Sequence, residues 1–103
     1  MKLIELNMDK IVALCKKYKV AKLWVFGSIL TTRFNDRSDV DFIVEFDSDR
    51  LDILDYADNF FDFIHSIEDV VKRKIDMVVD SSIRNPYFRK EVNDTRRLIW
   101  KKM

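Results

Sequence analysis

The alternation of hydrophobic and polar positions predicts a chain built of helices and strands in turn. Apolar residues recur at helical spacing from Ile11 to Tyr18, and Asn7 can cap this first helix. A second stripe, from Leu51 to about Val71, predicts an amphipathic helix of roughly five turns. Asn85-Pro86 is typical of a helix start, and this helix is predicted to run to about Asp94. The tail, residues 98–100, fits either its last turn or a short edge strand.

Three strands are predicted, at residues 22–26, 39–46 and 75–79. The second alternates most clearly, and one of its faces is apolar throughout. The residues on its other face are Asp39, Asp41, Ile43 and Glu45. In the third strand Asp76 lies on the face opposite to that of Ile75, Met77 and Val79. These patterns predict an α/β domain with helices packed on one sheet face and carboxylates on the other.

Composition narrows the class of protein. The 103 residues suit one compact domain, taken as residues 1–103. A net charge of +1 indicates no general attraction to nucleic acid or membranes, and the basic clusters around Arg73 and Arg97 are interpreted as solvated surface. No segment has the roughly 20 apolar residues of a membrane span. The single cysteine, Cys15, cannot form an internal disulfide, so we expect a soluble protein of the reducing cytoplasm.

The carboxylates are the first candidate for chemistry. Asp39 and Asp41 are two residues apart, so a strand would project both from one face with Cα atoms roughly 6.5 Å apart. Two hard oxygen donors at this spacing can converge on one or two Mg²⁺ ions, and Asp76 can complete the site if its strand is adjacent. The plainer alternative is that these aspartates are ordinary solvent-facing residues of a chain rich in Asp.

The second candidate is the turn at Gly27-Ser28, which follows the first strand. Glycine lets the backbone approach a ligand closely, and free N–H groups at a following helix start can bind phosphate. The Ser28 hydroxyl adds a further donor. Gly-Ser is also among the commonest turn dipeptides, so this motif alone is weak evidence.

The combination of these motifs resembles a known family. Gly27-Ser28, ten residues, and then Asp39-Val40-Asp41 resemble the signature of the DNA polymerase beta-like nucleotidyltransferase superfamily, with Asp76 where a third aspartate is expected. More narrowly, the chain looks like the minimal nucleotidyltransferase (MNT) family, small proteins usually paired with a HEPN-domain partner. The resemblance implies a small mixed β-sheet of the polymerase beta-like palm fold.

The resemblance also implies roles for individual residues. Asp39, Asp41 and Asp76 would ligate two Mg²⁺ ions, and Asp76 would help to deprotonate an acceptor hydroxyl. Gly27 and Ser28 would bind the β- and γ-phosphates of ATP or another NTP. One departure is clear: many relatives carry Arg-x-Arg-Gly directly after Gly-Ser, and this chain has Ile29-Leu30-Thr31-Thr32. Phosphate affinity or the acceptor could therefore differ, and Arg33 or Arg37 could substitute.

Three functions remain open at this stage. The first is transfer of AMP, or another NMP, to a hydroxyl of a HEPN toxin, which would make this chain an antitoxin of a toxin–antitoxin pair. The second is a module that neutralises such a partner by binding alone. A third, transfer to a small molecule such as an aminoglycoside, fits less well, because such enzymes usually need a second domain. A domain this small could also form a homodimer.

Overall fold

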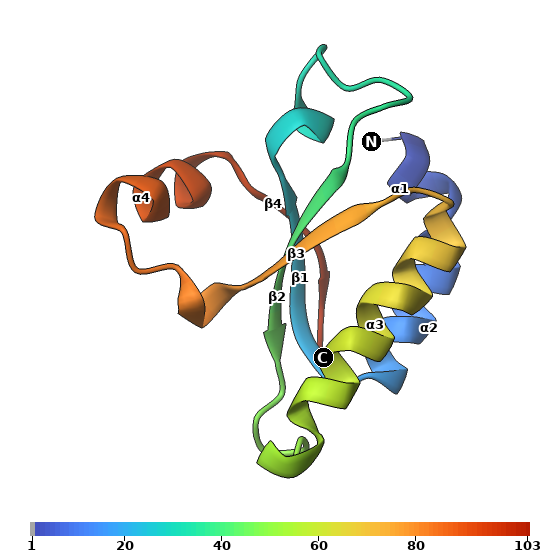
Figure 1. Ribbon diagram of the computed structural model, residues 1–103, viewed down its shortest axis with the longest axis vertical. Coiled ribbons are helices and arrows are strands. Elements are labelled where there is room, and N and C mark those ends of the chain that lie inside the picture. Colours follow the sequence, from blue (N-terminus) through green and yellow to red (C-terminus); the bar gives the residue numbers. More distant parts are fainter. Residues whose placement is uncertain (1) are drawn as a thin grey trace.

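The computed structural model describes residues 2–103 and contains one mixed four-stranded sheet, in the order β3-β2-β1-β4 (Figure 1). β1 (Val20–Phe26) is antiparallel to both β2 (Val40–Phe46) and β4 (Arg97–Lys101). β2 pairs in parallel with β3 (Ile75–Val79). The three predicted strands are thus confirmed within two residues, and the C-terminal tail is an edge strand rather than a last helical turn.

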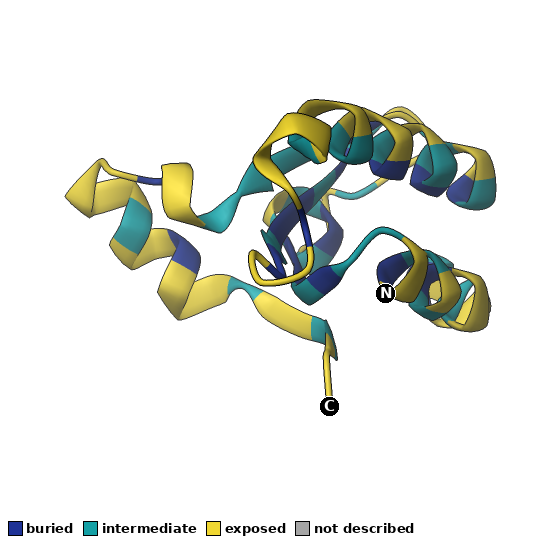
Figure 2. Ribbon diagram, turned by 90° about the horizontal axis from the view of Figure 1, so that it is seen from below, coloured by how far each residue is buried: buried dark blue, intermediate teal, exposed yellow. Residues whose placement is uncertain are grey.

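The apolar face of the sheet, here called the first face, is covered by three helices. These are α1 (Lys2–Leu6), α2 (Met8–Lys17) and α3 (Tyr56–Val71). Phe42 and Val44 of β2 pack there against Phe63 and Ile67 of α3, and all four are fully buried. Figure 2 shows buried residues concentrated in the sheet and along the inner sides of these helices. This layer is the main hydrophobic core.

The two predicted helices on this face differ from the structure at their starts. The helix predicted from Leu51 begins only at Tyr56, after a single 3₁₀ turn, η2 (Ile53–Asp55). The Asp52 side chain accepts a hydrogen bond from Leu54 N at 3.0 Å and caps this turn, which leaves Ile53 85% exposed. At the other helix, the Asn7 side chain does not cap α2 but donates to the Leu3 carbonyl at 2.8 Å.

The fourth helix corrects the prediction that helices cover only one face. α4 (Pro86–Thr95) lies on the opposite side of the sheet from α2 and α3 (Figure 1). Val92 of α4 packs with Trp24 and Ile43, which both point to this second face. The physical reason is that Trp24 and Ile43 create an apolar area among the charged residues, and its burial favours a covering helix. The carboxylates occupy only the part of this face that α4 leaves open.

Ion pairs fix α4 against the second face. Asp80, in the 3₁₀ turn η3 (Asp80–Ser82), accepts from Arg89 at 2.8 Å and from Arg96 at 2.7 Å. The Arg96 guanidinium also lies 4.1 Å from the centre of the Trp24 ring. Burial alone would raise the pKa of Asp80, but the two arginines outweigh it and hold that pKa below its usual value. Both ends of α4 are therefore attached to the sheet through one carboxylate.

Within residues 2–103, every helix is too short or too polar to pass through a lipid bilayer.

We predict that Val92→Ala lowers the free energy of unfolding by about 2 kcal/mol, because it removes two buried methyl groups and leaves a cavity. Tyr87→Ala is the control, since this residue of the same helix is 86% exposed and should change stability by less than about 0.5 kcal/mol. Urea unfolding of both variants measures the difference. Equal, small effects would contradict the packing of α4 on the second face.

Candidate functional site

The strand register brings two of the three predicted carboxylates together. Asp41 of β2 is paired with Asp76 of the parallel strand β3, and both side chains belong to the second face. On its other side Asp41 pairs with Phe26, the last residue of β1. The turn at Gly27-Ser28 begins at the next residue, so both predicted motifs meet at one end of the sheet.

The electrostatics of Asp41 reflect this crowding. Burial, followed by the charge of Asp76, its hydrogen bond and the charge of Asp39, raises the pKa of Asp41 to about 6. Asp76 itself is exposed, and Asp39 and Asp41 are half-buried. Two neighbouring carboxylates therefore act on Asp41 here, and a cation beside it would offset their negative charge.

Gly27 makes the closest contact with this cluster. Its φ is +76°, in the left-handed region that glycine adopts without strain. A Cβ atom added to Gly27 would lie only 2.5 Å from Asp41 Oδ2. The chain's single glycine is thus required twice, by the turn and by the space that the Asp41 carboxylate occupies.

Asp39 lies just before β2 rather than inside it, which corrects the predicted strand start. Its position is set by Arg73, a residue that the sequence analysis assigned to solvated surface. The Arg73 guanidinium donates to the carbonyl of Ser38 and, at 2.6 Å, to that of Asn35, and it lies 4.7 Å from the Phe34 ring centre. The loop is therefore tied to the start of β3 directly before Asp39.

The cluster is not a preformed metal centre. Among residues 2–103, no three His, Cys, Asp or Glu side chains converge closely enough to hold one ion as they stand. The donor chemistry nevertheless fits a hard divalent cation, because Asp39, Asp41 and Asp76 offer only carboxylate oxygens, and burial together with the charges of Asp76 and Asp39 raises the pKa of Asp41. Binding by all three would require these side chains to move closer together.

A cavity of about 630 Å³ adjoins the cluster at Gly27 and Ser28. One wall is η1 (Gly27–Leu30) with the loop that follows it, and the other comes from the end of α4 and the start of β4. The polar residues of the lining are Ser28, Thr31, Arg33, Glu91, Thr95 and Arg97. Sequence reasoning missed Glu91, Thr95 and Arg97, because only the second-face position of α4 brings them here.

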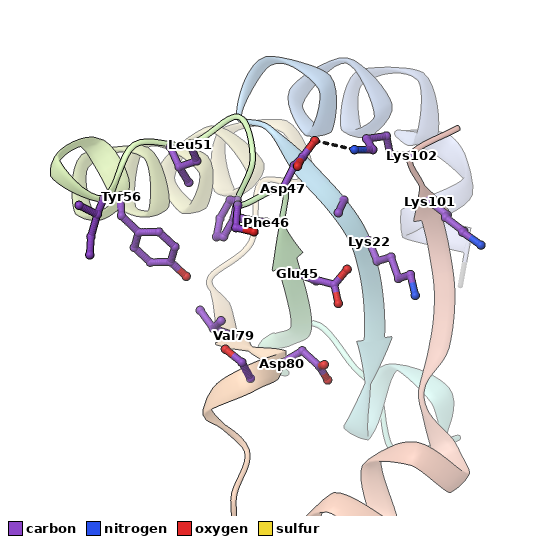
Figure 3. Close-up of a pocket in the computed structure, with 14 residues that line it drawn as sticks. Lys22, Glu45, Phe46, Asp47, Leu51, Tyr56, Val79, Asp80, Lys101 and Lys102 are labelled. Carbon is purple, nitrogen blue, oxygen red and sulfur yellow. Dashed lines mark hydrogen bonds and ion pairs between the residues drawn. The ribbon is translucent and has the colours of Figure 1, made fainter.

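A second, larger cavity of about 780 Å³ lies at the opposite end of the sheet (Figure 3). It includes Lys22 at the start of β1 and Phe46 at the end of β2, whereas Gly27 and Asp41 stand at the other ends of these strands. An ion pair of 2.6 Å between Lys102 and Asp47 closes part of its rim. None of the predicted site residues reaches this cavity.

Known proteins resemble this chain in sequence over most of its length. The family model described as "Polymerase beta, Nucleotidyltransferase" matches residues 9–103. Two proteins of Methanocaldococcus jannaschii, provisionally named protein adenylyltransferases, are 33% and 31% identical to this chain. The first alignment covers 77% of this chain and 76% of the relative, and the second covers 76% and 75%.

Solved structures share the fold. One, provisionally described as a minimal nucleotidyltransferase, superimposes with a TM-score of 0.68 at 24% identity, over 94% of this chain and 95% of that one. Another contains an MNT antitoxin in complex with a tri-AMPylated HEPN toxin of Shewanella oneidensis. It gives a TM-score of 0.62 at 20% identity, over 95% of this chain and 72% of the matched one. At these identities the likeness concerns the fold alone.

We predict that Gly27→Ala lowers the free energy of unfolding by about 2–4 kcal/mol, from left-handed backbone strain and overlap with Asp41. In an Asp41→Ala background the overlap is gone, and the cost should fall to the roughly 1–2 kcal/mol of backbone strain. A double-mutant cycle by urea unfolding measures both values. The same cost in the two backgrounds would contradict the close contact.

The raised pKa of Asp41 gives a second prediction. Because the folded state holds this proton more tightly than the unfolded chain, Asp41 costs stability as pH rises from about 4 through 6. Asp41→Asn should therefore raise the free energy of unfolding at pH 7 by about 1 kcal/mol, after allowance for partial exposure. Thermal unfolding of both proteins in metal-free buffer should show this gain at pH 7 and its loss below pH 4. A lower free energy of unfolding for Asp41→Asn than for the unmodified protein at pH 7 would contradict the raised pKa of Asp41.

Proposed function

This chain belongs to the polymerase beta nucleotidyltransferase family, and from that premise we propose that it transfers AMP from ATP to a hydroxyl group of a HEPN-domain partner protein. The observation that carries the proposal is the pairing of Asp41 with Asp76 directly beside the Gly27 turn. A nucleotidyltransferase needs carboxylates and a phosphate-binding turn in one place. The register of β1, β2 and β3 supports the proposal, because it brings Asp41 and Asp76 next to the Gly27 turn.

Three carboxylates would hold the metal. Asp39, Asp41 and Asp76 would bind Mg²⁺, as two ions if the cluster follows the two-metal pattern of phosphoryl-transfer enzymes. When bound, Mg²⁺ would neutralise charge on the transferred phosphate and on the departing pyrophosphate.

The remaining roles belong to residues of the chain itself. Asp76 is the most exposed of the three carboxylates, which suits it to meet an acceptor and take up its hydroxyl proton. Gly27 brings the turn against the Asp41 carboxylate, and Ser28 offers a hydroxyl donor on the wall of the adjoining cavity, where the β- and γ-phosphates would bind. The attacking hydroxyl forms a bond to the α-phosphorus, the bond to the β-phosphate oxygen breaks, and pyrophosphate leaves. Such displacement depends chiefly on positioning and charge neutralisation.

The identity of the acceptor rests on the relatives. Proteins that are about one-third identical to this chain are provisionally named protein adenylyltransferases. A structure with the same fold is an MNT antitoxin in complex with a tri-AMPylated HEPN toxin. These names support a protein acceptor and a HEPN partner, and with them an antitoxin role for this chain.

One observation favours a second candidate, a partner-binding module without catalysis. At the two positions after Gly27-Ser28 where many relatives carry arginines, this chain has Ile29 and Thr31, and Ile29 is buried in the core with 4% exposure. This turn therefore contributes packing instead of the usual phosphate-binding cations.

A transfer assay separates the two candidates. We predict that a HEPN-domain partner incubated with this protein, Mg²⁺ and ATP gains the mass of one or more AMP units. Asp39→Asn should reduce the rate by roughly 10²–10³-fold, because it removes a charge from the proposed metal site. The matched control is Asp36→Asn, an exposed aspartate of the preceding loop, which should retain the rate.

Intact-mass spectrometry of the partner reads out each reaction. Undiminished transfer by Asp39→Asn would overturn the proposed site. A stable complex whose partner gains no mass with the unmodified protein would favour the binding module instead.

A further inference from the structure

We propose that Arg33 and Arg97 form a phosphate-binding pair that takes the place of the missing arginines after Gly27-Ser28. The inference rests on the proposed function and adds to it the residues that bind the triphosphate of the nucleotide. Neither arginine belongs to the sequence motif. They are 64 positions apart in the chain and meet in the cavity beside η1.

Both arginines are available for a ligand. Arg73, Arg89 and Arg96 are each held by hydrogen bonds to other groups of the protein. Within residues 2–103, the guanidinium groups of Arg33 and Arg97 have no hydrogen-bond or ion-pair partner. Other arginines without partners, such as Arg37, do not line the cavity.

The backbone places Arg33 close to the Gly27-Ser28 turn. The Thr31 hydroxyl donates to the Ser28 carbonyl at 2.8 Å, and the backbone N–H of Thr31 donates to the same oxygen at 2.9 Å. The Arg33 N–H in turn donates to the Thr31 hydroxyl oxygen at 3.2 Å. The start of the loop is therefore folded back on the turn, and Arg33 stays at the cavity.

Arg97 reaches the cavity from the other wall. It is the first residue of β4 and pairs with Val25, two residues before Gly27. The preceding residue, Arg96, is fixed by Asp80 and Trp24, so the backbone is held immediately before Arg97. The Arg97 side chain itself is exposed.

The charges of the lining select an anion. Two free guanidinium groups face a single carboxylate, Glu91. Phosphate groups bound here would lie beside the Asp41–Asp76 pair, which repels them, so nearby cations are required to offset that repulsion. Guanidinium groups bind phosphate oxygens in bidentate fashion, which suits a chain of linked phosphates.

The test is binding of inorganic tripolyphosphate, measured by calorimetry in metal-free buffer. Arg33→Gln and Arg97→Gln should each raise Kd about tenfold or more, since each removes a charge-assisted contact. Glu91→Gln should lower Kd several-fold, because it removes the one repulsive charge of the lining. General damage to the fold would not raise Kd in the two arginine variants and lower it in the Glu91 variant, although all three residues line the same cavity.

Two matched controls complete the experiment. Arg37→Gln lies in the same loop as Arg33, and Lys101→Gln lies at the far end of the same strand as Arg97. Both are exposed, remove the same charge and should leave Kd unchanged. Unaltered binding by the Arg33 and Arg97 variants, equal losses in the controls, or no binding by the unmodified protein would each overturn the inference.

Tripolyphosphate carries no nucleoside, so the result is independent of transfer. A protein that shows the predicted pattern of Kd values but transfers no AMP would contradict the proposed function and leave the phosphate-binding pair standing. If the unmodified protein transfers AMP but the Arg33 and Arg97 variants bind tripolyphosphate normally, the phosphate-binding pair is contradicted and the proposed function stands.

Discussion

The position of the Asp41 carboxylate, between Asp76 of β3 and the α-carbon of Gly27 in the turn after β1, is the constraint on which the site depends. A side chain at Gly27 would overlap Asp41, and any shift of the parallel β2–β3 register would separate the two aspartates. The first face of the sheet fixes this register, because its buried residues, such as Phe42 and Val44, permit no slip. A hydrophobic core on one side therefore holds a strained electrostatic arrangement on the other.

The packing of α4 on the second face brings further charged residues beside Gly27-Ser28. Asp80 joins α4 to the sheet through two arginines, and the burial of Val92 against Trp24 and Ile43 completes the attachment. With α4 in place, its last turn and the start of β4 form one wall of the cavity beside Gly27-Ser28. Packing on this face thus determines which charged residues can meet a phosphate, which links the stability of α4 to the chemistry proposed beside its last turn.

The strands and the apolar face could be predicted from the sequence, because the alternation within β2 is a local pattern. The candidate site could also be proposed from the sequence, because Gly27-Ser28 and Asp39 are separated by a short, recognisable spacing. The sequence did not predict that α4 covers the second face. The signal was present in Ile43, the single apolar residue among the carboxylates of its face, but one residue does not specify a helix. The roles of Arg73 and Arg97 depend on contacts across 35 or more positions, and periodicity carries no information about such contacts. Both arginines sat in clusters that composition alone assigns to solvent.

The most direct test of the central claim, that the carboxylate cluster binds a divalent cation, is an NMR titration of the Asp41 carboxyl group with and without Mg²⁺. Without metal, the pKa of Asp41 should be about 6, raised by burial and by its two neighbours. Saturating Mg²⁺ should lower that pKa, because the cation favours the ionised form, and Asp36 in the preceding loop should show no change. A pKa of Asp41 that is the same in the presence and absence of Mg²⁺ would contradict the account.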